Sequence, residues 1–487
     1  MFSLVCIALL STFYVHAVAD ESVRRTGNDP KVLPSCQEIA LAISPASAVF
    51  MPGVPHSPFR VLLAGVELGA IGSSNYSYDI EHYLFSSTED SVCSIEPGSV
   101  EDLSKTIQII AKNRVPFAVK GGGHATNPEF SSTCGIHIAM SRFREINYNS
   151  TGQTVELGAG LLWDDVYVAL EPYGVIPPGA RAPGVGVAGF TLGGGKWVSW
   201  LANEHGLAMD SVLEYDLVLP NGTFVSVTQD SSPDLFFGLK GGFLFISTDY
   251  LDQVNAATMK FMSGVDPKAS IITNYEYSNG TQSVIIQLFY NGPNPAPGVF
   301  DDFLAIPAQL NNLTTQTFPS LIGSSGAQGV VRGRGNTVSS LGYSETFLKA
   351  SINESTFWGN KLKNQTGFRS LYSIEPFLPS PDSQSPPGST AFPSPPSLWS
   401  PTSITYLWED ASADPLVLSA ITKTAKHLTL VSKAEGQDID SLLLYSNYAI
   451  AGTSITRFYG SNVGRLRKIK YKYDPENVMG LAGGWKF

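Results

Sequence analysis

The chain has 487 residues, of which 43% are hydrophobic and 15% are charged, a composition typical of a globular protein rather than a disordered one. Its 42 acidic and 31 basic side chains give a formal net charge of −11, which argues against nucleic acid as a partner because phosphate binding needs an excess of Lys and Arg. The length allows two or three domains, or one large enzyme with two lobes.

The N-terminal segment has the pattern of a secretory leader. Its first 19 residues contain no charged side chain, and the apolar stretch from Leu4 to Val15 is too short to span a bilayer. Because this stretch ends in Ala17-Val18-Ala19, we expect a signal peptide cleaved before Asp20. No later stretch is long and apolar enough to predict a membrane span. Seven Asn-X-Ser/Thr sequons favour a secreted, N-glycosylated protein; they begin at Asn75, Asn149, Asn221, Asn279, Asn312, Asn353 and Asn364.

Loss of the leader would leave an odd number of cysteines, namely Cys36, Cys93 and Cys134. In an oxidising compartment this number predicts one disulfide and one remaining thiol. Cys36 and Cys93 both lie outside the glycine-rich motif near residue 121, which favours pairing these two and leaving Cys134 as the thiol. The spacing alone is compatible with other pairings.

From Cys93 onward the sequence alternates between strand and helix patterns. Ser99-Val-Glu-Asp is typical of a helix start, and apolar residues follow at helical spacing from Leu103 to Ala111. The short apolar run Pro116–Val119 predicts a buried strand, and a helix is expected between Trp163 and Leu170. Further strands are expected at 137–140, 154–157 and 215–220.

The C-terminal half mixes strands, helices and one proline-rich loop. Strands and polar helices alternate from about 265 to 375, and the prolines and serines of 376–403 predict a loop or lid. A helix is expected at 414–435 with Asp414 as its N-cap and Pro415 at its first position. The basic helix expected at 460–477 is interpreted as a solvated face rather than an anion site.

The first chemically suggestive motif is Lys120-Gly121-Gly122-Gly123-His124. Three glycines after a strand allow a tight turn whose backbone amides converge, which is suited to a pyrophosphate. The GxGxxG fingerprint of nicotinamide dinucleotide sites is absent, which argues against a nicotinamide dehydrogenase. From its spacing alone, the motif is more typical of a flexible turn with a surface histidine.

The second motif is the glycine-rich run from Pro183 to Gly195. An isolated strand or helix does not tolerate so many glycines, so the run predicts close packing against a flat partner such as a ring system. A purely structural crossing of a sheet is the alternative.

Together these segments resemble the berberine bridge enzyme-like oxidases of the vanillyl-alcohol-oxidase superfamily, with a PCMH-type FAD-binding domain. The similarity is greatest to secreted fungal members and runs in order through PFAVKGGGHATNPEFSSTCGIHIAMSRF, RAPGVGVAGFTLGGG, HGLAMDSVLEYDLVLPNGT, PDLFFGLKGG and YGSNVGRLRKIKYKYDPENV.

The resemblance implies an α+β fold with two lobes. A signal peptide would occupy 1–19, an FAD-binding domain 20–264 (its PCMH-type core about 87–260) and a substrate-binding domain with antiparallel sheet and helices 265–454. Residues 455–487 would return to the FAD lobe. We expect a monomer that acts on a small-molecule donor, with oxygen as the second substrate and without nucleic acid, membrane or metal.

The resemblance also implies FAD bonded covalently to His124. Many relatives have a second link from a cysteine, but Gly186 occupies that position here, so a single link is expected. Gly189 stands where the family controls oxygen access, and a small residue there favours an oxidase. The other cofactor-binding residues implied by the matched motifs are Lys120, Gly121, Gly122, Gly123, Ala125, Gly193, Gly194 and Asn447.

Tyr445-Ser-Asn447-Tyr448 resembles the family's Tyr-x-Asn-Tyr segment, whose tyrosine faces the flavin. Tyr448 is therefore the candidate base for removing a hydroxyl proton, with Tyr445 as the second choice. The alternative is that these tyrosines only fill the core or rim of the site. Glu375 and Asp410 are candidate helpers from the substrate side.

One stretch departs from the family. Relatives follow Lys-Gly-Gly with a strand along the cofactor, whereas an unrelated segment follows Lys240-Gly241-Gly242, so cofactor contacts near 243–256 are not expected to follow the family. The favoured function is an oxidase that converts a CH–OH donor, such as a carbohydrate or an aromatic alcohol, and releases hydrogen peroxide. The alternatives are a flavin dehydrogenase with a quinone or protein acceptor, and an inactive secreted protein that keeps the fold.

Overall fold

The structure is a computed structural model that describes residues 3–6, 29–52, 62–63, 66–67, 74–193, 195, 199–205, 208–228, 241–292, 295–311, 313–314, 317–323, 331–378, 391 and 399–487. Gly194, the sequon at Asn312 and most of the expected 376–403 loop lie outside these residues. No helix in this part of the chain is long and apolar enough to cross a membrane.

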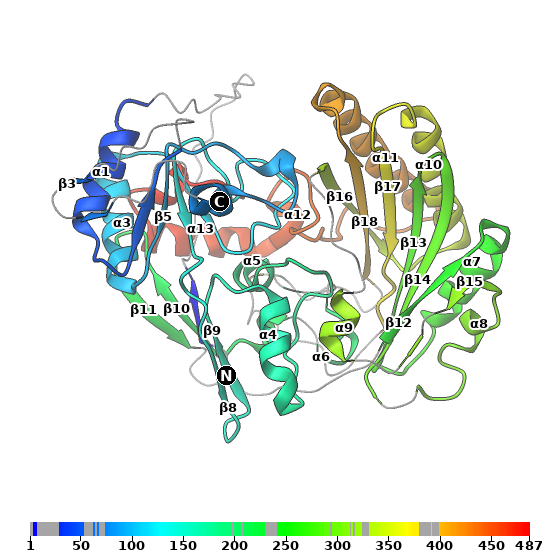
Figure 1. The fold of residues 1–487 in the computed structure, drawn as a ribbon. Coiled ribbons are helices and arrows are strands. Elements are labelled where there is room, and N and C mark those ends of the chain that lie inside the picture. Colours follow the sequence, from blue (N-terminus) through cyan, green and yellow to red (C-terminus); the bar gives the residue numbers. More distant parts are fainter. Residues whose placement is uncertain are drawn as a thin grey trace.

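The described chain forms two lobes side by side, which confirms the expected α+β class (Figure 1). One lobe combines the first half of the chain with its C-terminal end, and the other contains a large sheet covered by helices. Segment Leu84–Ser86 joins the two lobes, because Phe85 N–H donates to Val331 O at 3.0 Å and Ser86 exchanges hydrogen bonds with Gly333.

A four-stranded sheet lies at the start of the first lobe. Its order is β2-β5-β7-β6, with β5 and β6 both parallel to β7. The disulfide Cys36–Cys93, as expected, connects helix α1 to β5. The strands are β2 (Ala48–Phe50), β5 (Cys93–Glu96), β6 (Phe117–Lys120) and β7 (Ile136–Ala139), and the helices before and between them are α1 (Val32–Ala42), α2 (Ser74–Ile80) and α3 (Val100–Asn113). A separate small hairpin pairs β3 (Leu62–Leu63) with β4 (Val66–Glu67).

A five-stranded sheet completes this lobe, in the order β11-β10-β1-β9-β8. Its strands are β1 (Ser3–Cys6), β8 (Ile146–Asn149), β9 (Thr154–Leu157), β10 (Glu214–Val218) and β11 (Phe224–Thr228). The central strand β1 comes from the stretch expected to be a signal peptide. It pairs in parallel with β10 from Ser3↔Glu214 to Cys6↔Leu217, and with β9 at Leu4↔Leu157.

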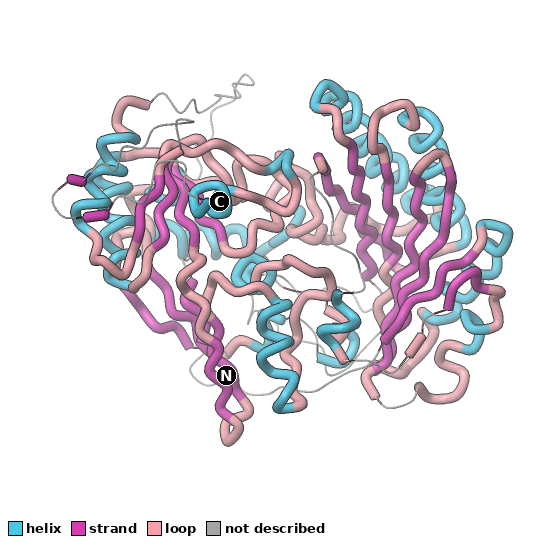
Figure 2. Tube along the Cα trace, viewed as in Figure 1, coloured by secondary structure: helices cyan, strands magenta, loops and turns pink. Residues whose placement is uncertain are grey.

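The second lobe is built on a seven-stranded antiparallel sheet, seen as the row of long magenta strands in Figure 2. Its strands, in spatial order, are β15 (Ala308–Asn311), β12 (Gly241–Ile246), β14 (Thr281–Tyr290), β13 (Ala269–Ser278), β17 (Arg369–Ile374), β18 (Trp399–Trp408) and β16 (Arg332–Leu341). One face is covered by α7 (Leu251–Phe261), α10 (Glu345–Leu362) and α11 (Asp414–Ala434), with α8 (Asp301–Leu304) beside α7 (Figure 1).

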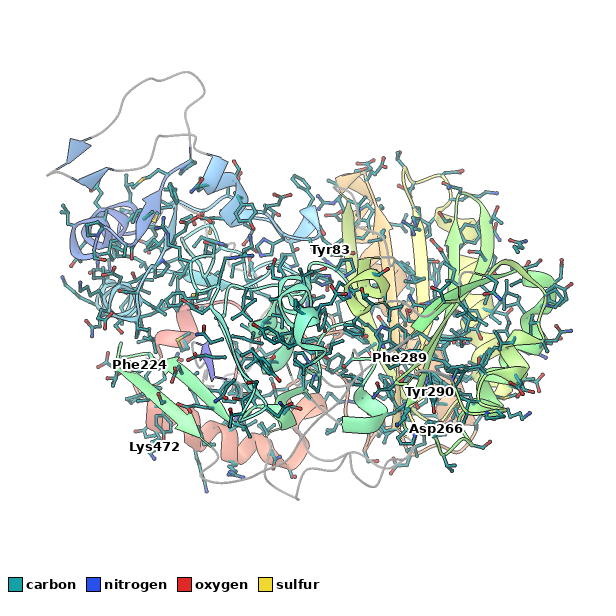
Figure 3. All side chains as sticks on the ribbon, turned by 60° about the horizontal axis from the view of Figure 1, so that its bottom comes forward. Tyr83, Phe224, Asp266, Phe289, Tyr290 and Lys472 are labelled. Atoms are coloured by element: carbon teal, nitrogen blue, oxygen red, sulfur yellow. A yellow bond between two sulfur atoms is a disulfide. The ribbon has the colours of Figure 1, made fainter. Side chains whose placement is uncertain are left out.

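The strand pairing moves two boundaries away from the sequence-based prediction. β12 pairs with β14 and β15, so the change of lobe comes before Gly241 rather than at 264. The expected proline-rich loop also ends earlier, because residues 399–403 already belong to β18 and pair with β16. Side chains fill this lobe as they fill the first; Tyr290 of β14, for example, donates from its hydroxyl to Asp266 at 3.1 Å (Figure 3).

Local sequence explains where several helices begin. Ser99 caps α3 by accepting from Asp102 N–H, and the buried side chains Leu103, Ile107 and Ile110 follow along one face. In α11 the expected N-cap is wrong, since Asp414 is the first helical residue. Its carboxylate instead pairs with Arg332 and accepts from Trp408 Nε1 at 2.8 Å.

The C-terminal segment docks on the first lobe through α12 (Thr456–Tyr459) and α13 (Val463–Tyr473). Val478 and Met479 belong to the core of that lobe, and Arg114 donates to Glu476 O at 2.9 Å. The exposed Lys472 lies on the outer surface of α13, towards the same side of the lobe as the exposed Phe224 of β11 (Figure 3). The other basic residues of the helix are exposed as expected of a solvated face, except Lys470, which is buried and pairs with Asp474.

Candidate functional site

The first glycine-rich motif forms the loop that leaves β6. Lys120, the last residue of the strand, points back and donates from Nζ to Tyr78 O at 2.9 Å and Asp79 O at 2.8 Å, at the end of α2. Gly123 has a φ of 72°, in the left-handed region that glycine adopts without strain, and its carbonyl accepts from Tyr83 N–H at 3.0 Å. The loop therefore turns sharply and presents His124 beside Tyr83.

The ring of His124 is held by stacking. It lies nearly parallel to the Tyr83 ring, with 4.0 Å between centroids, and Nε2 is buried without a hydrogen-bond partner among the described residues. Burial lowers the pKa of His124 to about 4, so the imidazole is neutral at physiological pH. A neutral, buried imidazole whose Nε2 lacks a partner is the form of histidine that can bond to an electrophilic carbon.

The second glycine-rich run packs directly against the first loop. Leu162 and Gly186 form a β-bridge, and α5 (Val187–Leu192) begins directly afterwards. A Cβ on Gly186 would overlap the backbone of Gly122, and a Cβ on Gly122 would overlap Gly186. The two motifs thus meet backbone to backbone, and position 186 has no room for a side chain in this arrangement.

Gly189 lies in α5, and a Cβ there would meet no atom of the described residues within 4 Å, so the space next to it is open in this part of the structure. Gly193 ends the same helix in the opposite situation, because a Cβ there would overlap the side chain of Asn447. Ser446 Oγ donates to Gly193 O at 3.3 Å. These contacts bring the C-terminal Tyr445–Tyr448 segment onto the second glycine-rich run.

The same C-terminal segment also reaches the His124 loop. Asn127 donates from Nδ2 to Ala449 O at 3.0 Å and accepts from Ala451 N–H at 3.0 Å. Gly335 of β16 packs against both Thr126 and the Tyr448 carbonyl, which a Cβ at 335 would meet at 3.3 and 3.4 Å. The expected residues from both ends of the chain are therefore gathered where the two lobes meet.

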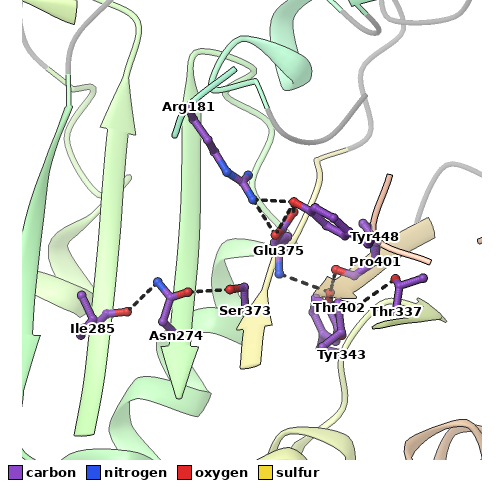
Figure 4. A network of polar contacts seen from close by, with 10 residues as sticks. All are labelled: Arg181, Asn274, Ile285, Thr337, Tyr343, Ser373, Glu375, Pro401, Thr402 and Tyr448. Carbon is purple, nitrogen blue, oxygen red and sulfur yellow. Dashed lines mark hydrogen bonds and ion pairs between the residues drawn. The ribbon is translucent and has the colours of Figure 1, made fainter. Parts of the chain in front are cut away.

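Three polar side chains form a compact cluster at this junction, in which Glu375 is buried and Arg181 and Tyr448 are partly buried (Figure 4). Arg181 Nη2 lies 2.5 Å from Glu375 Oε1 and 3.1 Å from Tyr448 Oη, and Tyr448 donates to Glu375 Oε1 at 3.1 Å. The Arg181 side chain is 11% exposed and that of Glu375 1%. Tyr445 lies edge-to-face against Tyr448 at 4.9 Å, and its hydroxyl accepts from Asn447 Nδ2 at 2.9 Å.

Burial and charge set the protonation of this cluster. Burial raises the pKa of Glu375, while Arg181 and the hydrogen bond from Tyr448 act in the opposite direction. Burial and the charge of Glu375 hold the pKa of Tyr448 well above 10, so this tyrosine is a neutral phenol. Tyr448 is therefore not a tyrosinate in this arrangement, because burial and the charge of Glu375 outweigh the effect of Arg181 on its pKa.

Glu375 is fixed from behind by the large sheet (Figure 4). Its backbone N–H donates to Tyr343 Oη at 3.3 Å, and Tyr343 donates to Pro401 O at 2.5 Å. Along the same sheet Ser373 donates to Asn274 at 2.7 Å. The position of Glu375 is thus determined by β17 and β18 rather than by a mobile loop.

The other predicted helper lies elsewhere. Asp410 is exposed and caps a short turn through Ser412, so it does not belong to the site. Ala125 lies next to His124 in the loop, and Gly194 lies outside the described residues. The sequence-based prediction missed Arg181 and Tyr83; the signal for Arg181 was a single cation inside a run of prolines and glycines.

Comparison with known proteins identifies the kind of protein that shares these features. The sequence pattern of the FAD binding domain matches residues 92–228, and that of the berberine and berberine-like domain matches residues 444–482. These two regions contain the His124 loop, the second glycine-rich run and the Tyr445–Tyr448 segment.

Two fungal proteins are similar in sequence. An FAD-linked oxidoreductase of Arthroderma benhamiae is 31% identical over 54% of this chain and 58% of its own length. An FAD-dependent monooxygenase of Penicillium terrestre is 28% identical over 80% of this chain and 79% of its own length. The match thus spans less than two thirds of the first relative.

Two solved structures share the fold. Physcomitrella patens BBE-like 1 superposes with a TM-score of 0.71 and 19% identity, covering 91% of this chain and 97% of the other. A chitooligosaccharide oxidase superposes with a TM-score of 0.67 and 19% identity, covering 84% and 95%. At this identity the structures establish a common two-lobed architecture.

Proposed function

We propose that this chain is a berberine bridge enzyme-like FAD-linked oxidoreductase and, from that premise, an oxidase acting on a CH–OH donor. The observation that carries the proposal is the contact of Tyr448 with Glu375, a neutral phenol donating to a buried carboxylate beside the two glycine-rich motifs. A site that oxidises an alcohol must receive a proton as well as a hydride, and this pair can receive the proton.

The chain's own residues fit FAD. The backbone-to-backbone contact of Gly122 and Gly186 leaves no side chain between the two loops, and the neutral His124 presents a partnerless Nε2 beside them. We assign the isoalloxazine to the space bounded by His124, α5 and the Tyr445–Tyr448 segment, and the pyrophosphate to Gly121–Gly123. When bound, FAD accepts the hydride from the donor carbon and passes the electrons to oxygen, giving hydrogen peroxide.

Proton removal falls to Tyr448 and Glu375. Because the phenol donates to Glu375, its oxygen can accept the hydroxyl proton of a donor while its own proton passes to the carboxylate. The base is therefore the pair, with Glu375 as the final acceptor, rather than a tyrosinate. Tyr445 supports the Tyr448 ring from the side and holds Asn447.

A single covalent bond from His124 is the second part of the proposal. Its support is the stacked, neutral imidazole and the crowding at position 186, which disfavours a side chain there. The open space at Gly189 supports oxygen rather than a quinone or a protein as the electron acceptor.

Two classes of donor remain candidates. The shared fold with a chitooligosaccharide oxidase favours a carbohydrate. An aromatic or other small alcohol is the second candidate, since the fungal relatives are not named as carbohydrate oxidases. Secretion is part of the same proposal. It is supported by the Cys36–Cys93 disulfide and by the sequon asparagines within the described residues, all of which are exposed: Asn75, Asn149, Asn221, Asn279, Asn353 and Asn364.

The testing experiment is the visible spectrum of the purified protein before and after acid precipitation, followed by mass analysis of the peptide that contains His124. We expect a flavin spectrum, flavin retained in the pellet and one flavin on His124. The variant H124A is the control and should release its flavin into the supernatant. Release from the wild-type protein would refute the covalent bond and leave the enzyme class standing.

A second candidate function, an inactive protein that keeps the fold, is favoured by one observation. The segment after Gly241, where relatives have a strand along the cofactor, pairs as β12 in the sheet of the other lobe. A folded but colourless protein would establish this alternative, and a bound flavin would reject it.

A further inference from the structure

Arg181 occupies an unusual place for a charged side chain. Its loop leaves the first lobe and carries the guanidinium into the junction, where it contacts Glu375 of the second lobe and Tyr448 of the C-terminal segment. The Trp200 ring lies on its other side, with 5.7 Å between the ring centroid and the guanidinium carbon. A cation this deeply buried is costly unless each contact is satisfied.

The loop that carries Arg181 is fixed at both ends to α4 (Trp163–Leu170). Tyr167 donates from its hydroxyl to Ala180 O at 2.7 Å, and Asp164 accepts from Gly184 N–H at 2.8 Å. A Cβ on Gly179 would overlap the Trp163 ring, so the chain lies flat against the helix just before Arg181. These contacts position the backbone that carries Arg181 independently of Glu375.

The hydrogen-bonding capacities of the three side chains fix the direction of the phenol hydrogen. A guanidinium only donates, so Tyr448 Oη must accept from Arg181 Nη2. The single hydrogen of Tyr448 is then directed to the nearest acceptor, Glu375 Oε1. The remaining lone pair of the phenol oxygen is available only as an acceptor, which is the role needed towards a donor's hydroxyl group.

The charges around Glu375 also point to Arg181 as the group that controls this carboxylate. The groups that face Glu375 are Arg181 from the 179–184 loop, Tyr448 and Tyr445 from the C-terminal segment, and Tyr343, which accepts from the Glu375 backbone. Among the residues that the structure describes, Arg181 is the only cation in this group. A carboxylate this buried would take up a proton if its cation were removed.

We propose that Arg181 is a positioning residue for the oxidation, which keeps Glu375 ionised and directs the hydrogen of Tyr448 towards it. This inference deepens the proposed function and rests on it. In the step it serves, the donor's O–H and C–H bonds break and a C=O bond forms. The hydroxyl proton moves to Tyr448 while the Tyr448 proton moves to Glu375, and the hydride with its electron pair goes to FAD.

The test compares R181M, R181K and the double variant R181M/E375Q, and its primary readout is the infrared C=O stretch of a protonated carboxylic acid. At pH 7 we expect R181M to show a protonated-carboxyl band that the wild type, R181K and R181M/E375Q lack in difference spectra, in which Asp79, whose burial raises its pKa to about 7, cancels because all four proteins contain it. The control is R332M, which removes the cation from Asp414, a carboxylate outside the site, and should not produce a band assigned to Glu375. Absence of the band in R181M would overturn the proposal.

Thermal unfolding gives a second readout that needs neither donor nor flavin. In R181M the folded-state pKa of Glu375 lies above its unfolded value, so stability is present at low pH and is lost as pH rises through the folded pKa. As the pH rises from 5 to 8, the Tm of R181M should therefore decrease more than the Tm of R181M/E375Q. Equal pH dependence in the two variants would overturn the proposal. If R181M folds only at acidic pH while R181M/E375Q does not need acidic pH, that result supports the proposal in the same way as the predicted fall in Tm.

Kinetics separate this inference from the proposed function. Each unit by which the pKa of Glu375 rises should slow flavin reduction about tenfold on the acidic side, with recovery at higher pH, and R181K should restore most of the rate. If Y448F and E375Q reduce flavin as fast as the wild type, the proposed proton path fails. If those variants are slow while R181M keeps the wild-type pH profile, only the role of Arg181 fails.

Discussion

The glycines of the two motifs cannot be told apart in the sequence, but they differ in the space around them in the structure. Gly122 and Gly186 are in contact with each other, and Gly193 is in contact with Asn447, so a side chain at any of the three would require another part of the protein to move. By contrast, a Cβ on Gly189 would meet no atom of the described residues within 4 Å. Of these four glycines, only Gly189 can be enlarged without moving another part of the protein.

This difference makes the role of Gly189 testable. We expect G189V to fold normally and to be re-oxidised by oxygen at least tenfold more slowly, a barrier increase of about 1.4 kcal/mol, because the side chain would fill the open space. The flavin is photoreduced without oxygen and mixed with aerated buffer, so no donor is needed. The control is G464V on α13, where a Cβ also meets nothing within 4 Å. Unchanged re-oxidation of G189V would contradict a role in oxygen access.

Individual residues were predictable from sequence only where a local motif contains them. His124 and Tyr448 each stand in such a motif, so their positions followed from the resemblance. Arg181, Glu375 and Tyr448 are separated by 194 and 73 positions, and only the packing of the two lobes brings them together. The sequence offered Glu375 and Asp410 on equal terms because nothing local distinguishes a carboxylate at a strand end from one in an exposed turn.

At the scale of elements, the Tyr445–Tyr448 segment is held by side chains that fit around a glycine. Asn447 occupies the space that a Cβ at Gly193 would need, and it also donates to Tyr445. Helices such as α3 and α4 were predictable because capping and apolar spacing are local properties. The placement of β12 was not, because an apolar run of strand length carries no information on which sheet it joins.

The contact between Gly193 and Asn447 predicts a coupled pair of substitutions. We expect G193A to lower the free energy of unfolding by about 1–3 kcal/mol, because the added methyl group must displace Asn447. N447A should cost about 1 kcal/mol through the lost hydrogen bond to Tyr445. The double variant should lose clearly less than the sum, since its methyl group meets a smaller side chain. Additive losses in chemical denaturation would contradict the contact.

At the scale of the whole molecule, the five-stranded sheet depends on the N-terminus of the chain. β1 lies between β10 and β9, yet its residues Ser3–Cys6 belong to the expected signal peptide. Cleavage before Asp20 would remove this strand from the middle of the sheet. The backbone N–H and C=O groups of β9 and β10 that face it would then lack partners, and unpaired backbone groups are costly unless water or another segment satisfies them.

We therefore expect a chain that begins at Asp20 to unfold at a lower temperature than the full chain, and the amides of β10 to exchange faster with solvent. The two forms are compared by calorimetry and hydrogen exchange, and the N-terminus of the secreted protein is determined by mass analysis. The variant L4P in the full chain should reproduce the truncation, because proline removes the N–H of a residue that pairs with Tyr215 and Leu157. If the truncated and full chains have the same Tm and the same exchange in β10, then β1 contributes nothing to the sheet. A lower Tm together with a secreted protein that begins at Asp20 would mean that the exported protein lacks β1, and that β9 and β10 lose the strand between them.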